Sequence, residues 1–113
     1  MNERGARAEQ LAVDFLVDRG LEIVTRNYRC RGGEIDIVAR DGGTLVFVEV
    51  RLRGSAAFGG PAASITAAKR RRLSFAARHY LGRLGREPDC RFDAILFSTL
   101  ALDGATWLRD VTI

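Results

Sequence analysis

Hydrophobic side chains recur every three to four positions in residues 6–19, which is the period of one helix face. They are Ala8, Leu11, Ala12, Phe15 and Leu16. We therefore expect an amphipathic helix over residues 6–19 that ends at Gly20, a residue suited to a helix C-terminus. From Leu21 to Tyr28 the pattern alternates, which predicts a strand around residues 22–25.

Two runs rich in β-branched residues, 34–39 and 45–51, predict a pair of neighbouring strands. Asp41-Gly42-Gly43 lies between them and is typical of a tight β-hairpin turn. Before the pair, residues 29–33 are expected to form a basic turn that contains glycine. After it the chain is rich in Gly, Ala and Ser as far as Pro61, which indicates a loop.

A second helix is expected over residues 65–84, with Ser64 as its N-cap. Two further strands are expected over residues 92–97 and 106–111. The predicted order is α-β-β-β-α-β-β, with no repeat and no internal linker. We therefore expect a single α/β domain over residues 1–113.

Acidic residues occupy hairpin positions that a buried sheet would ordinarily fill with hydrophobic ones. A two-residue turn at Gly42-Gly43 places Asp36 opposite Glu49. The same turn places Glu34 opposite Arg51, whereas a turn one residue earlier places Glu34 opposite Glu49. In either register all four charged side chains share one face, because side chains alternate with a period of two. Only a loop with an odd number of residues would split them.

Facing carboxylates destabilise a strand pair, and here Glu49 lies inside the apolar run of residues 46–50. Burying unpaired carboxylates is costly, so a compensating group is required. A hard cation such as Mg²⁺ or Mn²⁺, held by carboxylate oxygens and water, supplies that compensation. The alternative is an exposed sheet face on which Arg51 neutralises one of the acids.

The two helices add a cation and a third carboxylate. On a helical wheel of the second helix, Lys69 falls inside the apolar stripe, whereas Arg70 and Arg71 point outward. Glu9 borders the stripe of the first helix. Each has an ordinary alternative: a lysine whose charged end reaches solvent at the edge of the stripe, and a solvated surface glutamate. The apolar stripe of the second helix consists of Ile65, Ala68, Leu73, Ala76 and Tyr80.

The composition is that of a globular protein with a basic surface. The 113 residues are 47% hydrophobic and carry a net charge of +4, and seventeen of the eighteen bases are Arg. This excess fits a polyanionic partner, because Arg pairs with phosphate in a bidentate geometry, but it fits a GC-rich genome equally well. Two cysteines without a CxxC spacing argue against structural zinc and a disulfide framework. With no membrane-length apolar run and no signal peptide, we expect a cytoplasmic protein that does not contact membranes.

The charged positions also occur in a known order. The sequence resembles the metal-dependent nuclease core PD-(D/E)xK and is more specifically similar to the YraN family of small bacterial proteins, over nearly the whole chain. The segments that carry this resemblance are Glu9, Gly33-Glu34-Ile35-Asp36, Phe47-Val48-Glu49-Val50-Arg51, Phe58-Gly59, Lys69-Arg70-Arg71-Arg72 and Arg91-Phe92-Asp93. Archaeal Holliday junction resolvases are similar at a greater distance. The resemblance implies a restriction-endonuclease-like fold with a mixed central sheet of about five strands between two helices.

The resemblance further implies an endonuclease that hydrolyses DNA phosphodiester bonds with Mg²⁺ or Mn²⁺, including those of branched recombination or repair intermediates. Asp36 and Glu49 would be metal ligands, with Glu9 completing the site directly or through water. The backbone carbonyl of Val50 would be a further ligand. Such a metal would polarise a phosphodiester oxygen and lower the pKa of the attacking water.

The sequence departs from the motif at Arg51, which stands where the motif has a lysine. Arg51 can stabilise negative charge but, being always protonated, cannot act as a base. Lys69 is a candidate to supply the missing ammonium. A nucleic-acid-binding or adaptor module that has lost the chemistry is therefore the second reading, and a structural domain with a satisfied ion cluster is the third. A homodimer is left open. The expected phosphate contacts are Arg29, Arg31, Arg53, Arg70, Arg71 and Arg72.

Overall fold

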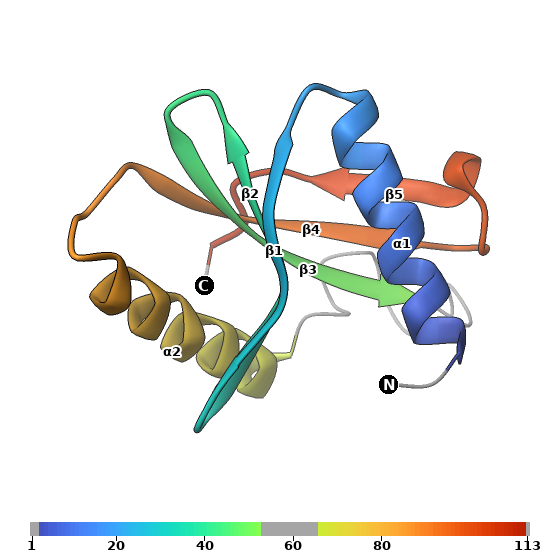
Figure 1. Cartoon of the computed structure of the whole chain (residues 1–113). Helices are drawn as coiled ribbons and strands as arrows, with labels where there is room; N and C mark the ends of the chain where they lie inside the picture. Colours follow the sequence, from blue (N-terminus) through green and yellow to red (C-terminus); the bar gives the residue numbers. More distant parts are fainter. Residues whose placement is uncertain (1–2, 53–65, 113) are drawn as a thin grey trace.

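The structure, a computed structural model, describes residues 3–52 and 66–112. Within these residues it contains two α-helices and a mixed five-stranded sheet of order β1-β2-β3-β4-β5 (Figure 1). The elements are α1 (Glu3–Asp18), β1 (Glu22–Cys30), β2 (Gly33–Asp41), β3 (Thr44–Leu52), α2 (Ala67–Leu84), β4 (Cys90–Phe97), the 3₁₀ turn η3 (Leu102–Gly104) and β5 (Ala105–Leu108). β3 and β4 are parallel and the other pairs are antiparallel. The predicted α/β element order is confirmed.

The two helices pack on opposite faces of the sheet, because hydrophobic side chains alternate along the central strands. On β3, Val46 and Val48 belong to the core beneath α1, whereas Leu45 and Phe47 belong to the core beneath α2. All four are buried. This two-sided burial explains why residues 45–48 form a continuous apolar run and confirms that β3 is a central strand.

The β2–β3 hairpin adopts the first of the two registers considered above. Asp41 pairs with Thr44 and Ile37 pairs with Val48, so Gly42-Gly43 is the two-residue turn. Gly42 has a φ of 60°, a left-handed conformation that glycine adopts at no steric cost. The ladder ends at the Ile37–Val48 pair, although β3 continues along β4 as far as Leu52. β2 therefore separates from β3 just before the ladder would reach Asp36.

A kink in the β1–β2 hairpin accompanies this separation. Asn27 has a φ of 54°, a conformation that Asn tolerates better than most residues. Ile35 packs in the core beneath α2 and Ile37 in the core beneath α1, although residues two apart in a regular strand face the same side. The tip of the hairpin therefore rotates at Asn27 and Asp36 and packs Tyr28 against α2 (Figure 1).

Helix α2 approaches the start of β2 unusually closely. A Cβ atom on Gly33 would lie 2.1 Å from the backbone oxygen of Arg72 and 3.1 Å from the backbone nitrogen of Ala76. Only glycine fits at this contact. Gly33, the glycine of the Gly-Glu-Ile-Asp segment, thus fixes the distance between α2 and the acidic end of β2.

Several element boundaries differ from the sequence predictions. α2 begins at Ala67 with Thr66 as its N-cap, because the Thr66 hydroxyl accepts a hydrogen bond from the Lys69 amide; Ser64 and Ile65 lie outside the described residues. Ala68, predicted on the inner stripe, is exposed. β1 extends to Cys30 and β2 begins at Gly33, so only Arg31 and Gly32 of the predicted turn lie outside the strands. β5 ends at Leu108, shortly before Asp110, which has a φ of 55°.

Candidate functional site

A cavity of about 200 Å³ opens where β2 and β3 separate. Residues from four elements line it: the first half of α1, the start of β2, the end of β3 and the first turn of α2. They are Gly5, Ala8, Glu9, Glu34, Asp36, Glu49, Val50, Arg51, Leu52 and Lys69. All the residues predicted as catalytic or metal-binding therefore line this one cavity.

Asp36 and Glu49 form the centre of the cavity. The Glu49 carboxyl hydrogen-bonds to Asp36, and its pKa is raised to about 8, first by burial and then by the hydrogen bond to Asp36 and its charge. The nearby charges of Lys69 and Arg51 act in the opposite direction. Oδ2 of Asp36 also accepts a hydrogen bond of 2.8 Å from the backbone amide of Val50. Val50 lies beyond the last residue of β3 that pairs with β2. The Glu49 carboxyl therefore carries a proton at neutral pH and is the donor of its hydrogen bond to Asp36.

Glu9 is the third carboxylate of the cavity and the most buried, with 2% of its surface exposed. Its Oε1 accepts hydrogen bonds from Arg26 Nε at 3.0 Å and from Asn27 Nδ2 at 2.9 Å. Its Oε2 is buried and has no hydrogen-bond partner. Glu9 therefore fixes the kink in β1 with one oxygen and leaves the other free for a donor or a cation.

Two cations face these acids. Lys69, in the first turn of α2, and Arg51, near the end of β3, both line the cavity and interact with the charge of Glu49. Nε of Arg51 is buried without a partner. Lys69, the candidate for the missing ammonium, thus lines the same cavity as Asp36 and Glu49.

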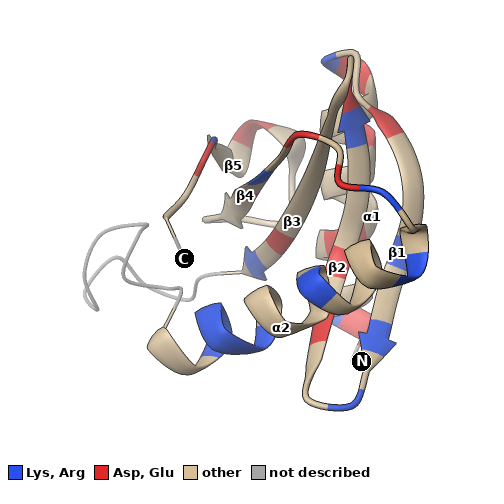
Figure 2. Ribbon diagram, turned by 90° about the vertical axis from the view of Figure 1, so that its left-hand side faces the viewer, with Lys and Arg blue, Asp and Glu red and all other residues tan. Residues whose placement is uncertain are grey.

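Glu34 lies at the rim, where it pairs with two arginines of the predicted nucleic-acid surface. Its carboxylate is 3.5 Å from Arg29 Nε and 3.8 Å from Arg72. Half of the Glu34 side chain is exposed, so these pairs are weak and can be exchanged for phosphate. Figure 2 shows the basic segments of α2 beside the acidic segment at the start of β2.

The other predicted phosphate contacts differ in exposure. Arg31 and Arg71 are exposed. The outward orientation predicted for Arg70 is wrong: the residue is half-buried and its Nε is inaccessible and unpartnered. Arg70 lies seven residues before the buried Ala77 and therefore on the same side of α2, at the edge of its buried stripe. Arg53 lies outside the described residues.

The donor set suits a hydrated hard cation better than a closed metal cage. No three Asp, Glu, His or Cys side chains in residues 3–52 and 66–112 are grouped closely enough to enclose a metal ion. Mg²⁺, however, commonly keeps several waters and uses only one or two carboxylates together with substrate phosphate. Asp36 and Glu49 would supply those carboxylates, and the free Oε2 of Glu9 would contact a bound water. Glu9 thus fits the water-mediated role and not direct ligation beside the pair.

Two further residues matter to the site and were missed by the sequence analysis. Arg26 and Asn27 hold Glu9, and Asn27 also makes the kink that separates β2 from β3. The only available signal was an Asn within an otherwise strand-like segment, since Asn is common at left-handed positions.

A second buried acid, Asp93 on β4, is fully paired and therefore structural. Its carboxylate accepts hydrogen bonds from Arg91, from Trp107 Nε1 at 3.0 Å and from the Asp110 amide at 2.9 Å. These contacts join β4 to β5 and to the chain beyond it. The contrast with Glu9, which keeps an unsatisfied oxygen, distinguishes a structural acid from a candidate ligand.

Neither helix of the described part is long and apolar enough to cross a membrane.

Comparisons with other proteins place the chain in a bacterial family. A UPF0102 protein of Methylobacillus flagellatus is 54% identical over 97% of this chain and 96% of its own length. A UPF0102 protein of Cupriavidus taiwanensis is 58% identical over 94% of this chain and 79% of its own. The family model described as "Uncharacterised protein family UPF0102" matches residues 8–97, which include every described cavity residue except Gly5. The chain therefore belongs to the UPF0102 family.

Proposed function

We propose that this protein is a divalent-metal-dependent endonuclease that hydrolyses phosphodiester bonds in DNA, with the cavity between β2 and β3 as its active site. The observation that carries the proposal is the convergence of Asp36, Glu49 and the free Oε2 of Glu9 in one cavity with Lys69 and Arg51. The resemblance of the sequence to the PD-(D/E)xK core supports the same reading.

The energetics of the cavity also support a cation site. Two contacting carboxyls and a buried, unsatisfied glutamate oxygen are costly for a folded protein. Structural acids avoid this cost by full pairing, as Asp93 does. An arrangement retained without such pairing is typical of a functional site. A cation would replace the proton held by Glu49 and satisfy both carboxylates.

Each residue then has a role in hydrolysis. Asp36 and Glu49 would hold Mg²⁺ or Mn²⁺, which would polarise the phosphodiester and lower the pKa of the attacking water. Glu9 would orient a water through Oε2. Lys69 and Arg51 would stabilise the negative charge that develops on the phosphate oxygens. Lys69 would also orient the attacking water, whereas Arg51, being always protonated, would not act as a base.

A second function is favoured by one observation, the arginine at position 51 in place of the lysine of the motif. In that case the protein binds nucleic acid through its basic surface and does not cleave it. The two functions share a binding surface and differ only in bond cleavage, so a cleavage assay separates them.

The test is incubation with linear, flapped and four-way-junction DNA in Mg²⁺ or Mn²⁺, followed by denaturing electrophoresis. We expect metal-dependent cleavage of at least one substrate and a loss of about 100-fold or more in Asp36→Asn. Asparagine keeps an oxygen that accepts from the Val50 amide, so this variant should fold, which circular dichroism checks. Cleavage that persists in Asp36→Asn would refute the site, and binding without cleavage of any substrate would favour the second function.

A further inference from the structure

One stripe of α2 combines aromatic and cationic side chains. Arg72, Phe75, His79 and Arg83 follow one another at intervals of three or four residues, so they lie on one side of the helix. Phe75 is 48% exposed, which is unusual for so large an apolar side chain.

The stripe borders the tip of the β1–β2 hairpin along its length. Arg72 pairs with Glu34. The Phe75 ring lies over Gly32, within 3.4 Å of where a Cβ atom would be. Further along, His79 Nδ1 and the Tyr28 hydroxyl are 2.6 Å apart. We call this strip of surface, formed by Arg72, Phe75, His79 and Arg83 with the adjoining Tyr28, the α2 seam.

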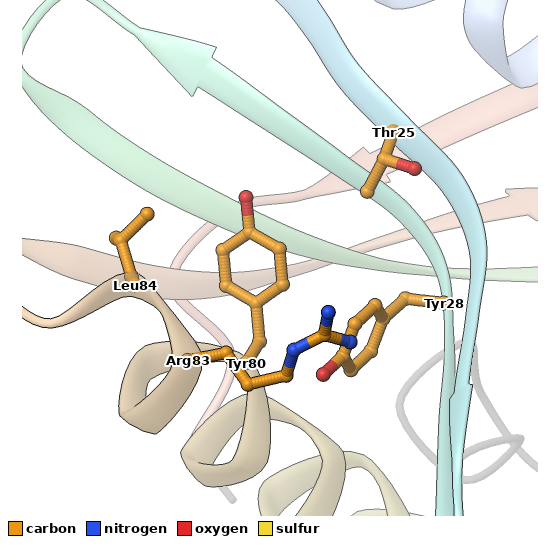
Figure 3. Close-up of a pocket in the computed structure, with 5 residues that line it drawn as sticks. All are labelled: Thr25, Tyr28, Tyr80, Arg83 and Leu84. Carbon is orange, nitrogen blue, oxygen red and sulfur yellow. The ribbon is translucent and has the colours of Figure 1, made fainter.

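The seam ends at a second cavity, of about 320 Å³, between β1 and the last turns of α2. Figure 3 shows its five lining residues, with the Tyr28 and Tyr80 rings on α2's side of β1 and the Arg83 side chain extending toward Tyr28. The two rings meet edge to face with centroids 5.2 Å apart. The cavity thus offers aromatic walls, hydroxyls and one guanidinium. It is completed by Thr25 and Leu84.

We propose that the α2 seam binds an unpaired strand of DNA, with a base stacked on Phe75 and another in the cavity beside Tyr28 and Tyr80. Every helix neighbour of Phe75 at three or four residues is basic or a histidine, and all of them are exposed. An apolar protein partner would gain nothing from these charges, whereas a polyanion carrying flat aromatic bases matches both features. The neighbours are Arg71, Arg72, Arg78 and His79.

The seam also begins beside the candidate active site, because Arg72 pairs with Glu34, which lines the first cavity; in this respect the inference rests on the proposed function. Lys69 lines the first cavity and Arg83 lines the second, and both are on α2. At a rise of 1.5 Å per residue, they lie about 21 Å apart along the helix axis. A stacked strand covers that distance with roughly six nucleotides at 3.4 Å each. The seam therefore favours substrates in which an unpaired strand adjoins the bond to be cut.

The test is fluorescence anisotropy with labelled oligothymidylates of three to twelve nucleotides in EDTA, so that binding is measured without cleavage. Affinity should rise up to about six nucleotides and then level off. Phe75→Leu should weaken binding of the six-nucleotide probe by about ten-fold, because leucine is apolar but has no ring, and Phe75→Tyr should restore it. Leu102→Ala is the matched control, since Leu102 is 50% exposed and lies in η3.

A second arm tests the far end of the seam. Arg83→Ala should reduce the slope of log affinity against log salt by about 0.7 for the six-nucleotide probe and leave the three-nucleotide probe unchanged. Equal affinity of wild type and Phe75→Leu, or an equal loss in Leu102→Ala, would overturn the proposal.

The proposal for the seam and the proposal for the hydrolytic site can be refuted independently of each other. If Phe75-dependent binding is found but no DNA is cleaved, the seam stands and the hydrolase proposal falls. If DNA is cleaved but Phe75→Leu binds the oligothymidylates as the wild type does, the seam proposal is refuted and the hydrolase proposal stands.

Discussion

Glu49 combines burial with a neighbouring carboxylate, and together they raise its pKa to about 8 against 4.5 for the free side chain. Between these two values the folded state holds a proton that the unfolded chain releases. The free energy of unfolding must therefore fall as the pH rises from 4.5 to 8, and level off above it. Glu49 acts against stability at neutral pH, as expected of a residue placed for binding.

We predict that Glu49→Gln removes this pH dependence. Glutamine has nearly the same shape and no charge, so the variant should match the wild type near pH 5 and exceed it by roughly 1–3 kcal/mol near pH 9. Urea unfolding at the two pH values measures the difference. A wild type whose stability does not fall between pH 5 and 8 would show that Glu49 is not protonated in the folded state.

Under the proposed function, Lys69 would supply the ammonium that this sequence lacks at position 51, where the motif has a lysine. Lys69→Met keeps the aliphatic stem and removes the charge, so cleavage should slow by about 100-fold while DNA binding changes little. Arg51→Lys should preserve or raise the rate, because it restores the residue of the motif. Arg86→Met, an exposed charge outside the cavity and outside the predicted phosphate contacts, is the control. Equal rates in Lys69→Met and Arg86→Met would remove Lys69 from the mechanism.

At the scale of elements, the strand pairing was predictable and the kink was not. The Gly42-Gly43 turn defines a two-residue loop, and the resulting register pairs Ile37 with Val48, the residues next to Asp36 and Glu49. The separation of β2 from β3 depends on Asn27, whose left-handed conformation is stabilised by a hydrogen bond to Glu9 from a different element. A contact between residues 18 positions apart leaves no local pattern in the sequence.

The same distinction applies to the helices. The period of apolar residues predicts the buried side of α1, but it places Glu9 only at the border, since periodicity cannot reveal that Arg26 and Asn27 would pair with a buried carboxylate. In α2 the pattern places Lys69 inward correctly and Arg70 outward wrongly. Arg70 shares its side of α2 with the buried Ala77, seven residues later, and so small a residue gives little signal in the hydrophobic pattern.

Gly33 sets the spacing between α2 and β2, and its replacement tests that spacing. Gly33→Ala would drive a methyl group into the Arg72 carbonyl, so we expect destabilisation of about 2 kcal/mol or more and displacement of Lys69 from the cavity. Gly43→Ala is the matched control, because a Cβ atom there meets nothing within 4 Å. Thermal unfolding of both variants measures the effect. Equal melting temperatures would show that α2 can shift without cost.

Across the whole molecule, arginines give the protein a net charge of +4, and four exposed arginines lie on α2, the helix whose Lys69 lines the cavity: Arg71, Arg72, Arg78 and Arg83. Binding through phosphate contacts releases counterions, so affinity for DNA should fall steeply with salt and show little sequence preference. Arg71→Glu should weaken binding by about ten-fold without unfolding the protein, since Arg71 is exposed. Filter binding at several salt concentrations measures this. Salt-independent affinity would exclude phosphate contacts as its source.

The central claim is that Asp36 and Glu49 hold a divalent cation, and titration calorimetry with Mn²⁺ tests it most directly. We predict one ion per chain and an affinity that increases from pH 6 to pH 8, because the ion must displace the proton held by Glu49. Asp36→Asn and Glu49→Gln should each weaken binding by at least ten-fold. Absence of binding at millimolar Mn²⁺ at pH 8, or equal binding by wild type and both variants, would contradict the account.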